Sequence, residues 1–185
     1  MYRLAAVLLL VSPSLYAHTG STIEHSVLSG LLHPLTGIDH LLVLMAVGLC
    51  AAKQGGKALL LFPLLFLALM AVGALMSVAS VDMPFLESFI TASILVFGVL
   101  VSVNHKPLAK ILFVCASFFA VFHGYAHAAE IPNDSSVVLY FSALMLSSAG
   151  VTLGSSLLGH YAGKRAHLSF SLACLSAGLY YLAAV

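Results

Sequence analysis

Six long apolar segments dominate the sequence and restrict the folds that are open to it. They cover residues 27–52, 58–80, 85–104, 107–129, 136–159 and 167–185. Each is close to the length of about 20 residues that a helix needs to cross the hydrocarbon of a bilayer. Only 7% of the residues are charged, against about 25% in a typical soluble domain. The sequence therefore predicts an all-α, polytopic membrane protein with six transmembrane helices.

The charged residues alternate in sign from one connection to the next, and this predicts an orientation. The first, third and fifth connections are flanked by basic residues: Lys53, Lys57, Lys106, Lys110, Lys164 and Arg165. The N-terminal segment and the other connections are flanked by acidic residues: Glu24, Asp82, Glu87, Glu130 and Asp134. Basic loops stay in the cytoplasm, so we expect a bacterial cytoplasmic (inner) membrane protein with the mature N-terminus and the C-terminus on the periplasmic side. A division of six spans into three and three permits an inverted repeat.

The first residues have the pattern of a signal peptide that is removed after residue 17. Arg3 precedes a short apolar run at 4–11, which is too short to span a bilayer, and Ala17 ends a cleavage-like region. Leu15 is not the small residue preferred at its position, so the exact cleavage site stays open. We expect a signal peptide at 1–17, an outer segment at 18–33 and a six-helix transmembrane domain at 34–185.

The outer segment is predicted to hold a short helix that lies near the membrane interface. Ser21 and Glu24 form a capping box of the S-x-x-E type, and an apolar stripe at helical spacing follows. Pro34 disfavours helix at His33, so we expect a break there and the first full span at 34–52. In the fifth span, Gly150 and Gly154 form a GxxxG pair that predicts close helix packing.

The break is followed by ionisable residues in an apolar context, within the stretch HPLTGIDH at 33–40. His33 and His40 are seven residues apart, so on a continuous helix they share one face, whereas Asp39 points about 100° away. Gly37 lies on the face of the two histidines and would let another backbone approach closely. An aspartate inside a span costs about 2.5–3.5 kcal/mol, and such groups are usually functional.

A second set of ionisable residues ends the fourth apolar segment, in the stretch FHGYAHAAE at 122–130. His123, His127 and Glu130 follow the spacing 0, 4, 7, which places them on one narrow helix face. The first and fourth spans are antiparallel, and His40 and His123 are expected at similar depths from the outer side. Imidazoles and carboxylates suit Ni²⁺, Co²⁺ or Zn²⁺. Cys50, Cys115 and Cys174 are isolated and are interpreted as buried apolar residues.

The two stretches resemble the signatures of a known family. HPLTGIDH is similar to the HPxxGxDH signature of the HupE/UreJ family of nickel permeases, and FHGYAHAAE resembles its HGxAHGxE signature, with Ala128 where the family has glycine. The resemblance implies secondary uptake of Ni²⁺, or of Co²⁺, for metalloenzymes such as hydrogenase or urease. It implies that the functional set is His33, Asp39, His40, His123, His127 and Glu130.

Two other functions remain open from the residues alone. Paired histidines on facing helices could hold haem in an electron-transfer protein, although the acids would have no role in ligation. Three ligands and an open position could also serve an intramembrane metal hydrolase. The sequence has no P-loop, so an ion gradient or the membrane potential would drive transport by a protein that is not an enzyme and needs no prosthetic group. The near-zero net charge implies no nucleic-acid partner.

The remaining histidines lie outside the two stretches. His18 and His25 lie at the outer side, where they could help Glu130 to collect an ion. His105, His160 and His167 lie among lysines at the predicted cytoplasmic side, and we interpret them as ordinary interface residues. The choice among Ni²⁺, Co²⁺ and Zn²⁺ and the oligomeric state are not determined by the sequence.

Overall fold

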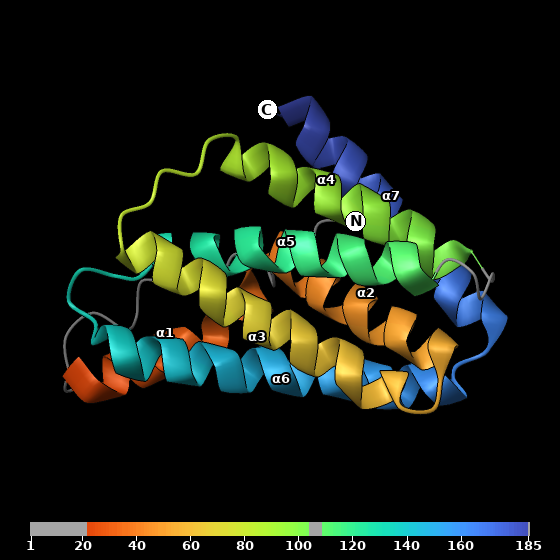
Figure 1. The fold of residues 1–185 in the computed structure, drawn as a ribbon, viewed down its shortest axis with the longest axis horizontal. Coiled ribbons are helices and arrows are strands. Elements are labelled where there is room, and N and C mark those ends of the chain that lie inside the picture. Colours follow the sequence, from red (N-terminus) through yellow and green to blue (C-terminus); the bar gives the residue numbers. More distant parts are fainter. Residues whose placement is uncertain (1–21, 104–108, 185) are drawn as a thin grey trace, which may run out of the picture.

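The structure, a computed structural model, describes residues 22–103 and 109–184, and within these ranges all regular structure is helical. The described helices, shown in Figure 1, are α1 (Thr22–Thr36), α2 (Ile38–Gln54), α3 (Ala58–Val78), α4 (Leu86–Ser102), α5 (Ala109–Ala129), α6 (Val137–Tyr161) and α7 (Lys164–Ala184). The all-α prediction is confirmed for this part of the chain. The predicted signal peptide at 1–17 and Ser21 of the capping box lie outside it.

The lengths of the helices bear directly on the predicted spans. Among the described residues, three helices are long and apolar enough to cross a bilayer: Ala58–Val78, Val137–Tyr161 and Lys164–Ala183. A fourth crossing is available if α1 and α2 act as one broken span. Leu86–Ser102 and Val114–Ala129 are shorter apolar helices. Each predicted segment thus corresponds to helix, and the membrane character is clear, while the count of six crossings stays a prediction.

The predicted break at His33–Pro34 is wrong in position, because α1 continues through Pro34 and ends at Thr36. Pro34 removes one backbone donor in the last turn, which the helix tolerates. The hydroxyl of Thr36 then donates toward the carbonyl oxygens of Leu32 (3.1 Å) and His33 (3.2 Å), and competes with the backbone for them. Gly37 is extended and starts α2, and the two helices meet at 73°. The segment is therefore two helices around Gly37.

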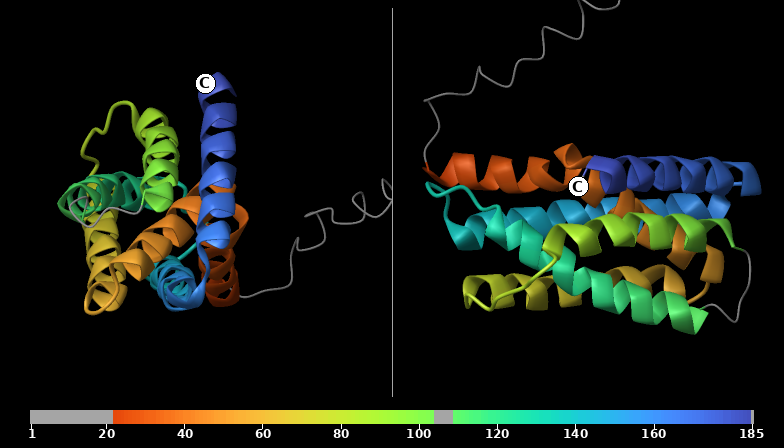
Figure 2. Two further views of the ribbon diagram at one scale, coloured as in Figure 1. Left: turned by 90° about the vertical axis from the view of Figure 1, so that its right-hand side faces the viewer. Right: turned by 90° about the horizontal axis from the view of Figure 1, so that it is seen from above.

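The helices pack in pairs that are distant in sequence. The closest pairs are α3 with α5, α2 with α6, α1 with α6 and α4 with α7. Figure 2 shows the bundle from two further directions, and α4 and α7, which pack against each other, can be followed there by their colours. An inverted repeat would relate α2, α3 and α4 to α5, α6 and α7. Exchanging α2 with α5 and α3 with α6 converts the α3–α5 pair into the α2–α6 pair. This pairing is compatible with the inverted repeat, which stays a prediction.

Glycines allow the backbones of neighbouring helices to approach closely at these contacts. The two glycines that the sequence indicated, Gly150 and Gly154, are not among them. A Cβ atom would meet open space at Gly150 and at Gly154, so the prediction that this GxxxG pair packs against a helix is wrong within the described chain. A Cβ on Gly30 would instead clash with the backbone of Tyr140, and one on Gly48 with Thr152. These two glycines seat α1 and α2 on α6, because glycine alone leaves room for the neighbouring backbone.

The two ends of the bundle differ in charge. The α2–α3 and α6–α7 connections lie at the right-hand end in Figure 1, and the α3–α4 and α5–α6 connections lie at the left-hand end. Lys53 and Lys164 line one cavity at the first of these ends. Glu87 lies at the other end, close enough to Glu130 and Asp39 for their charges to interact. The alternation along the sequence thus becomes a basic end and an acidic end.

Candidate metal site

Three histidines from three helices meet between the acidic end and the core. One ring nitrogen each of His33 (α1), His40 (α2) and His127 (α5) lie within 4.8 Å of one another. The ring centroids of His40 and His127 are 4.2 Å apart, and those of His33 and His127 are 4.9 Å apart. Ligands around a tetrahedral ion at about 2.1 Å lie about 3.4 Å apart. Closing the separations by up to about 1.4 Å would therefore let the three rings bind one ion.

The bend at Gly37 brings His33 and His40 together. The prediction that they share a face assumed one continuous helix, whereas their rings converge, 5.9 Å apart, from two helices. A Cβ on Gly37 would lie 3.1 Å from the ring of His40 and 3.2 Å from the carboxylate of Asp39. The absence of a side chain at Gly37 therefore makes room for these two groups, and the predicted approach of another backbone at Gly37 is wrong.

His127 occupies the most enclosed position in the cluster. Its exposed fraction is 0%, and neither ring nitrogen has a hydrogen-bond partner among the residues that the structure describes. Leaving a buried polar group unpaired costs about 1–3 kcal/mol. A neutral imidazole with a free lone pair is also the form that binds a divalent metal. The burial of His127 thus has a cost that metal binding would offset.

His123 lies one turn from His127 on α5 and contacts the three-histidine cluster through His40, without being one of its three members. Its Nδ1 is 3.0 Å from Nδ1 of His40, and its Nε2 is 2.9 Å from Oγ of Ser93. Ser93 donates its own proton to the carbonyl oxygen of Ile90 at 2.6 Å, so its oxygen accepts from His123. With both rings neutral, His123 carries its proton on Nε2. Nδ1 of His40 then donates to Nδ1 of His123. Nε2 of His40 is then left unprotonated as a ligand atom.

The two predicted carboxylates lie beside different histidines. An oxygen of Glu130 is 3.0 Å from Nε2 of His33, in ion-pair range although not aligned for a hydrogen bond from that nitrogen. The His33 ring lowers the pKa of the half-exposed Glu130, which is therefore a carboxylate at neutral pH. An oxygen of Asp39 is 4.0 Å from Nε2 of His40. Each acid is more exposed than the histidine beside it.

The site also includes three residues that the sequence did not single out. Ser93 on α4 orients His123, and Tyr140 on α6 has its ring centroid 5.9 Å from that of His33. Glu87 adds a third acid, whose charge interacts with those of Glu130 and Asp39. The hydroxyl of Tyr140 is buried without a hydrogen-bond partner among the described residues. Ser93 is a polar residue within an apolar run, and this pattern could have identified it from the sequence. No sequence pattern identifies Tyr140, because its position in the site depends on the packing of α6 against α1.

The spacing of the rings argues against one of the alternatives. A haem held by two histidines needs its macrocycle between their rings, with each nitrogen on the axis of the iron. Centroids 4.2 Å apart for His40 and His127, and 5.2 Å apart for His40 and His123, leave no room for it. The arrangement suits a single ion.

The fold and the cluster define a class before any comparison is made: a helical membrane protein with a buried group of metal-binding side chains. Residues 6–184 match the family described as HupE / UreJ protein, and the chain belongs to this family. It is 32% identical over 140 residues to "Protein HupE" of Rhizobium leguminosarum bv. viciae, covering 75% of this chain and 73% of that protein. No solved structure matches the chain.

Proposed function

We propose that this chain is a permease that carries a divalent transition metal ion, Ni²⁺ first and Co²⁺ second, inward across the bacterial inner membrane. The observation that carries the proposal is the three-histidine cluster of His33, His40 and His127 inside an apolar bundle. Imidazole ligands with nearby carboxylates favour borderline divalent metals over Mg²⁺ or Ca²⁺. The ion would supply metalloenzymes such as hydrogenase or urease, and the chain would act as a transporter without a prosthetic group.

The path begins at the acidic end of the bundle. Glu87, Glu130 and Asp39 place negative charge on the more exposed side of the cluster, where a dication would collect. The rings of His33, His40 and His127 would then replace part of its water shell. His123 lies next to His40 on the inner side, so it is the first group that an ion leaving the cluster would meet. A +2 ion moving inward across about 100 mV gains roughly 4.6 kcal/mol.

The direct test is metal uptake by proteoliposomes that contain the full chain. With an inside-negative potential, we expect the accumulation of Ni²⁺, competition by Co²⁺, and no competition by Mg²⁺, which is a poor match for imidazole. Collapse of the potential should stop the accumulation. Zn²⁺ in the same assay determines how far the site discriminates among metals that share its ligand types. Correctly folded protein that accumulates none of the three transition metals would contradict the proposal.

A second test addresses the hydrogen-bond chain that ends at His40. Ser93→Ala removes the acceptor for His123 Nε2 and frees His123 to adopt the other tautomer. Its Nδ1 would then donate to His40 Nδ1, and the proton of His40 would move to Nε2, where it blocks the ligand atom. We expect metal affinity to fall about 10- to 100-fold, the usual effect of losing a group that orients a ligand. Titration of the purified protein with Ni²⁺ measures it.

The matched control for Ser93 is Ser102→Ala on the same helix. Ser102 also donates to the carbonyl three residues earlier, at 2.7 Å from Val99, but it is exposed. The Ser102→Ala substitution should leave metal affinity unchanged. Equal losses in the two variants would show that Ser93 acts only through helix stability.

A further inference from the structure

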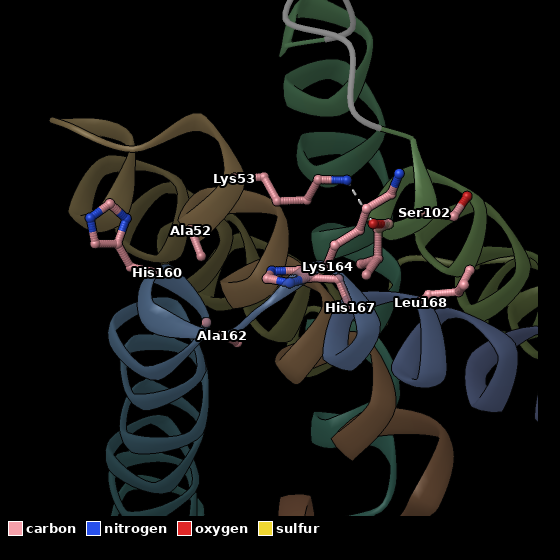
Figure 3. Close-up of a pocket in the computed structure, with 10 residues that line it drawn as sticks. Ala52, Lys53, Ser102, His160, Ala162, Lys164, His167 and Leu168 are labelled. Carbon is pink, nitrogen blue, oxygen red and sulfur yellow. Dashed lines mark hydrogen bonds between the residues drawn. The ribbon is translucent and has the colours of Figure 1, made fainter.

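A polar cavity lies at the end of the bundle opposite to the metal site. It has a volume of about 270 Å³ and is enclosed by the ends of α2, α4 and α6 and the start of α7. Its polar lining includes Lys53, Ser102, His160, Lys164 and His167 (Figure 3). Lys53 follows His40 by thirteen residues on α2, which is about 20 Å of helix. The cavity is therefore separate from the three-histidine cluster.

The charge of this cavity is positive. Two ammonium groups line it, those of Lys53 and Lys164, and no carboxylate is among the described residues that do so. Figure 3 shows both lysine side chains directed to the same part of the cavity. The Nζ atom of Lys53 donates to the carbonyl oxygens of Val101 (2.7 Å) and Val103 (2.6 Å), which leaves one of its three donors. Such an arrangement repels a metal ion and attracts an anion.

His167 also lines the cavity and carries an unpartnered group. Its exposed fraction is 9%, and its Nε2 is buried without a hydrogen-bond partner among the described residues. Its Nδ1 is 3.3 Å from the carbonyl oxygen of Gly163 and donates to it. A small turn of the ring that exposes Nε2 to the cavity would let a doubly protonated His167 donate to a phosphate there, while Nδ1–H keeps its bond to Gly163.

The start of α7 supports the same ligand. The helix begins at Lys164, has no acidic residue in its first turn, and carries Lys164, Arg165 and His167 there. Positive side chains at a helix N-terminus are unfavourable in the field of the helix, whereas an anion is favourable there. A bound anion would therefore offset both the helix dipole and the repulsion between the two lysines.

We propose that this cavity binds a phosphate group, carried either by an anionic phospholipid or by a free phosphate compound. Both sources present the same chemical group, a phosphate with two or three negative oxygens. These oxygens would accept hydrogen bonds from the ammonium groups of Lys53 and Lys164 and from the His167 ring. Basic pockets between helix ends are known sites for phospholipid headgroups. The proposal does not depend on metal transport.

The experiment compares two single-charge variants of the full chain in two arms. Lys164→Gln removes a group that lines the cavity, and Arg165→Gln removes the same charge from the next residue, which is exposed and does not line it. In the first arm, native mass spectrometry counts phosphatidylglycerol bound to protein from nanodiscs of phosphatidylcholine and phosphatidylglycerol. In the second arm, inorganic phosphate is titrated against delipidated protein in detergent, with chloride at equal ionic strength, and the thermal midpoint is followed.

We expect wild-type protein and Arg165→Gln to bind in at least one arm, and Lys164→Gln to bind at least about tenfold more weakly in that arm. Binding of phosphatidylglycerol alone identifies a lipid headgroup, and stabilisation by inorganic phosphate alone identifies a free phosphate compound. If Lys164→Gln does not fold, His167→Asn takes its place with the same expected loss. Absence of binding in both arms, or equal losses in the variant and its control, would overturn the proposal.

Discussion

Replacement of His127 by leucine is expected to abolish metal uptake while leaving the protein as stable as the wild type or more so. His127 is fully buried, and both of its nitrogens lack hydrogen-bond partners in the described chain. Leucine has a similar volume and relieves a cost of about 1–3 kcal/mol per unpaired group, against a repacking cost of less than about 1.5 kcal/mol when volume is conserved. Metal affinity should fall at least about 100-fold, since loss of a mere orienting group already costs about 10- to 100-fold.

Uptake in proteoliposomes and thermal unfolding in detergent measure the two effects on the same preparation. The matched control is His160→Leu, which changes an exposed histidine at the other end of the bundle and should leave uptake intact. A structural role for His127 would give the reverse pattern: a lower thermal midpoint with uptake retained. That outcome would remove His127 from the site and leave His33 and His40 as a pair that is too small for a stable metal site.

The positions of the helices could be predicted because apolar length is a strong local signal. The segment at 58–80 became α3 at Ala58–Val78, and the segment at 136–159 became α6 at Val137–Tyr161. The break near His33 was predicted from Pro34 alone, and it occurs at Gly37 instead. A proline shows where a backbone donor is missing, but it did not show that α1 would continue to Thr36 and pack against α6 before the bend.

The site was predictable where its residues share one helix and less so where they do not. His123 and His127 were placed on one face of α5 by their spacing, and both rings contact His40 in the structure. The sequence could not show that His123 bonds to Ser93, because Ser93 comes from α4 and only the fold brings them together. Nor could it rank the glycines, since GxxxG spacing identifies a smooth face without showing whether a neighbour covers it.

Substitution of Gly124 by alanine is expected to destabilise the fold and to disturb the site, whereas the same change at Gly150 should be neutral or stabilising. Gly124 lies between His123 and His127, and a Cβ there would clash with the backbone of Met70 on α3. Gly73 on α3 meets Val121 in the same way. Backbone cannot yield as a flexible side chain can, so we expect a cost of about 1–3 kcal/mol from overpacking, above the gain of about 0.5–1 kcal/mol in helix propensity.

At Gly150 only the propensity term operates, because nothing in the described chain lies within 4 Å of the added atom. Thermal unfolding of the two variants should therefore shift in opposite directions from the wild type. Gly124→Ala should also weaken Ni²⁺ binding. If α5 moves away from α3, it carries both His123 and His127 out of their positions in the site. An equal or higher midpoint for Gly124→Ala would show that the α3–α5 contact is looser than the structure has it. Destabilisation without any change in Ni²⁺ affinity would show that the histidines are positioned by α1 and α2 rather than by α3.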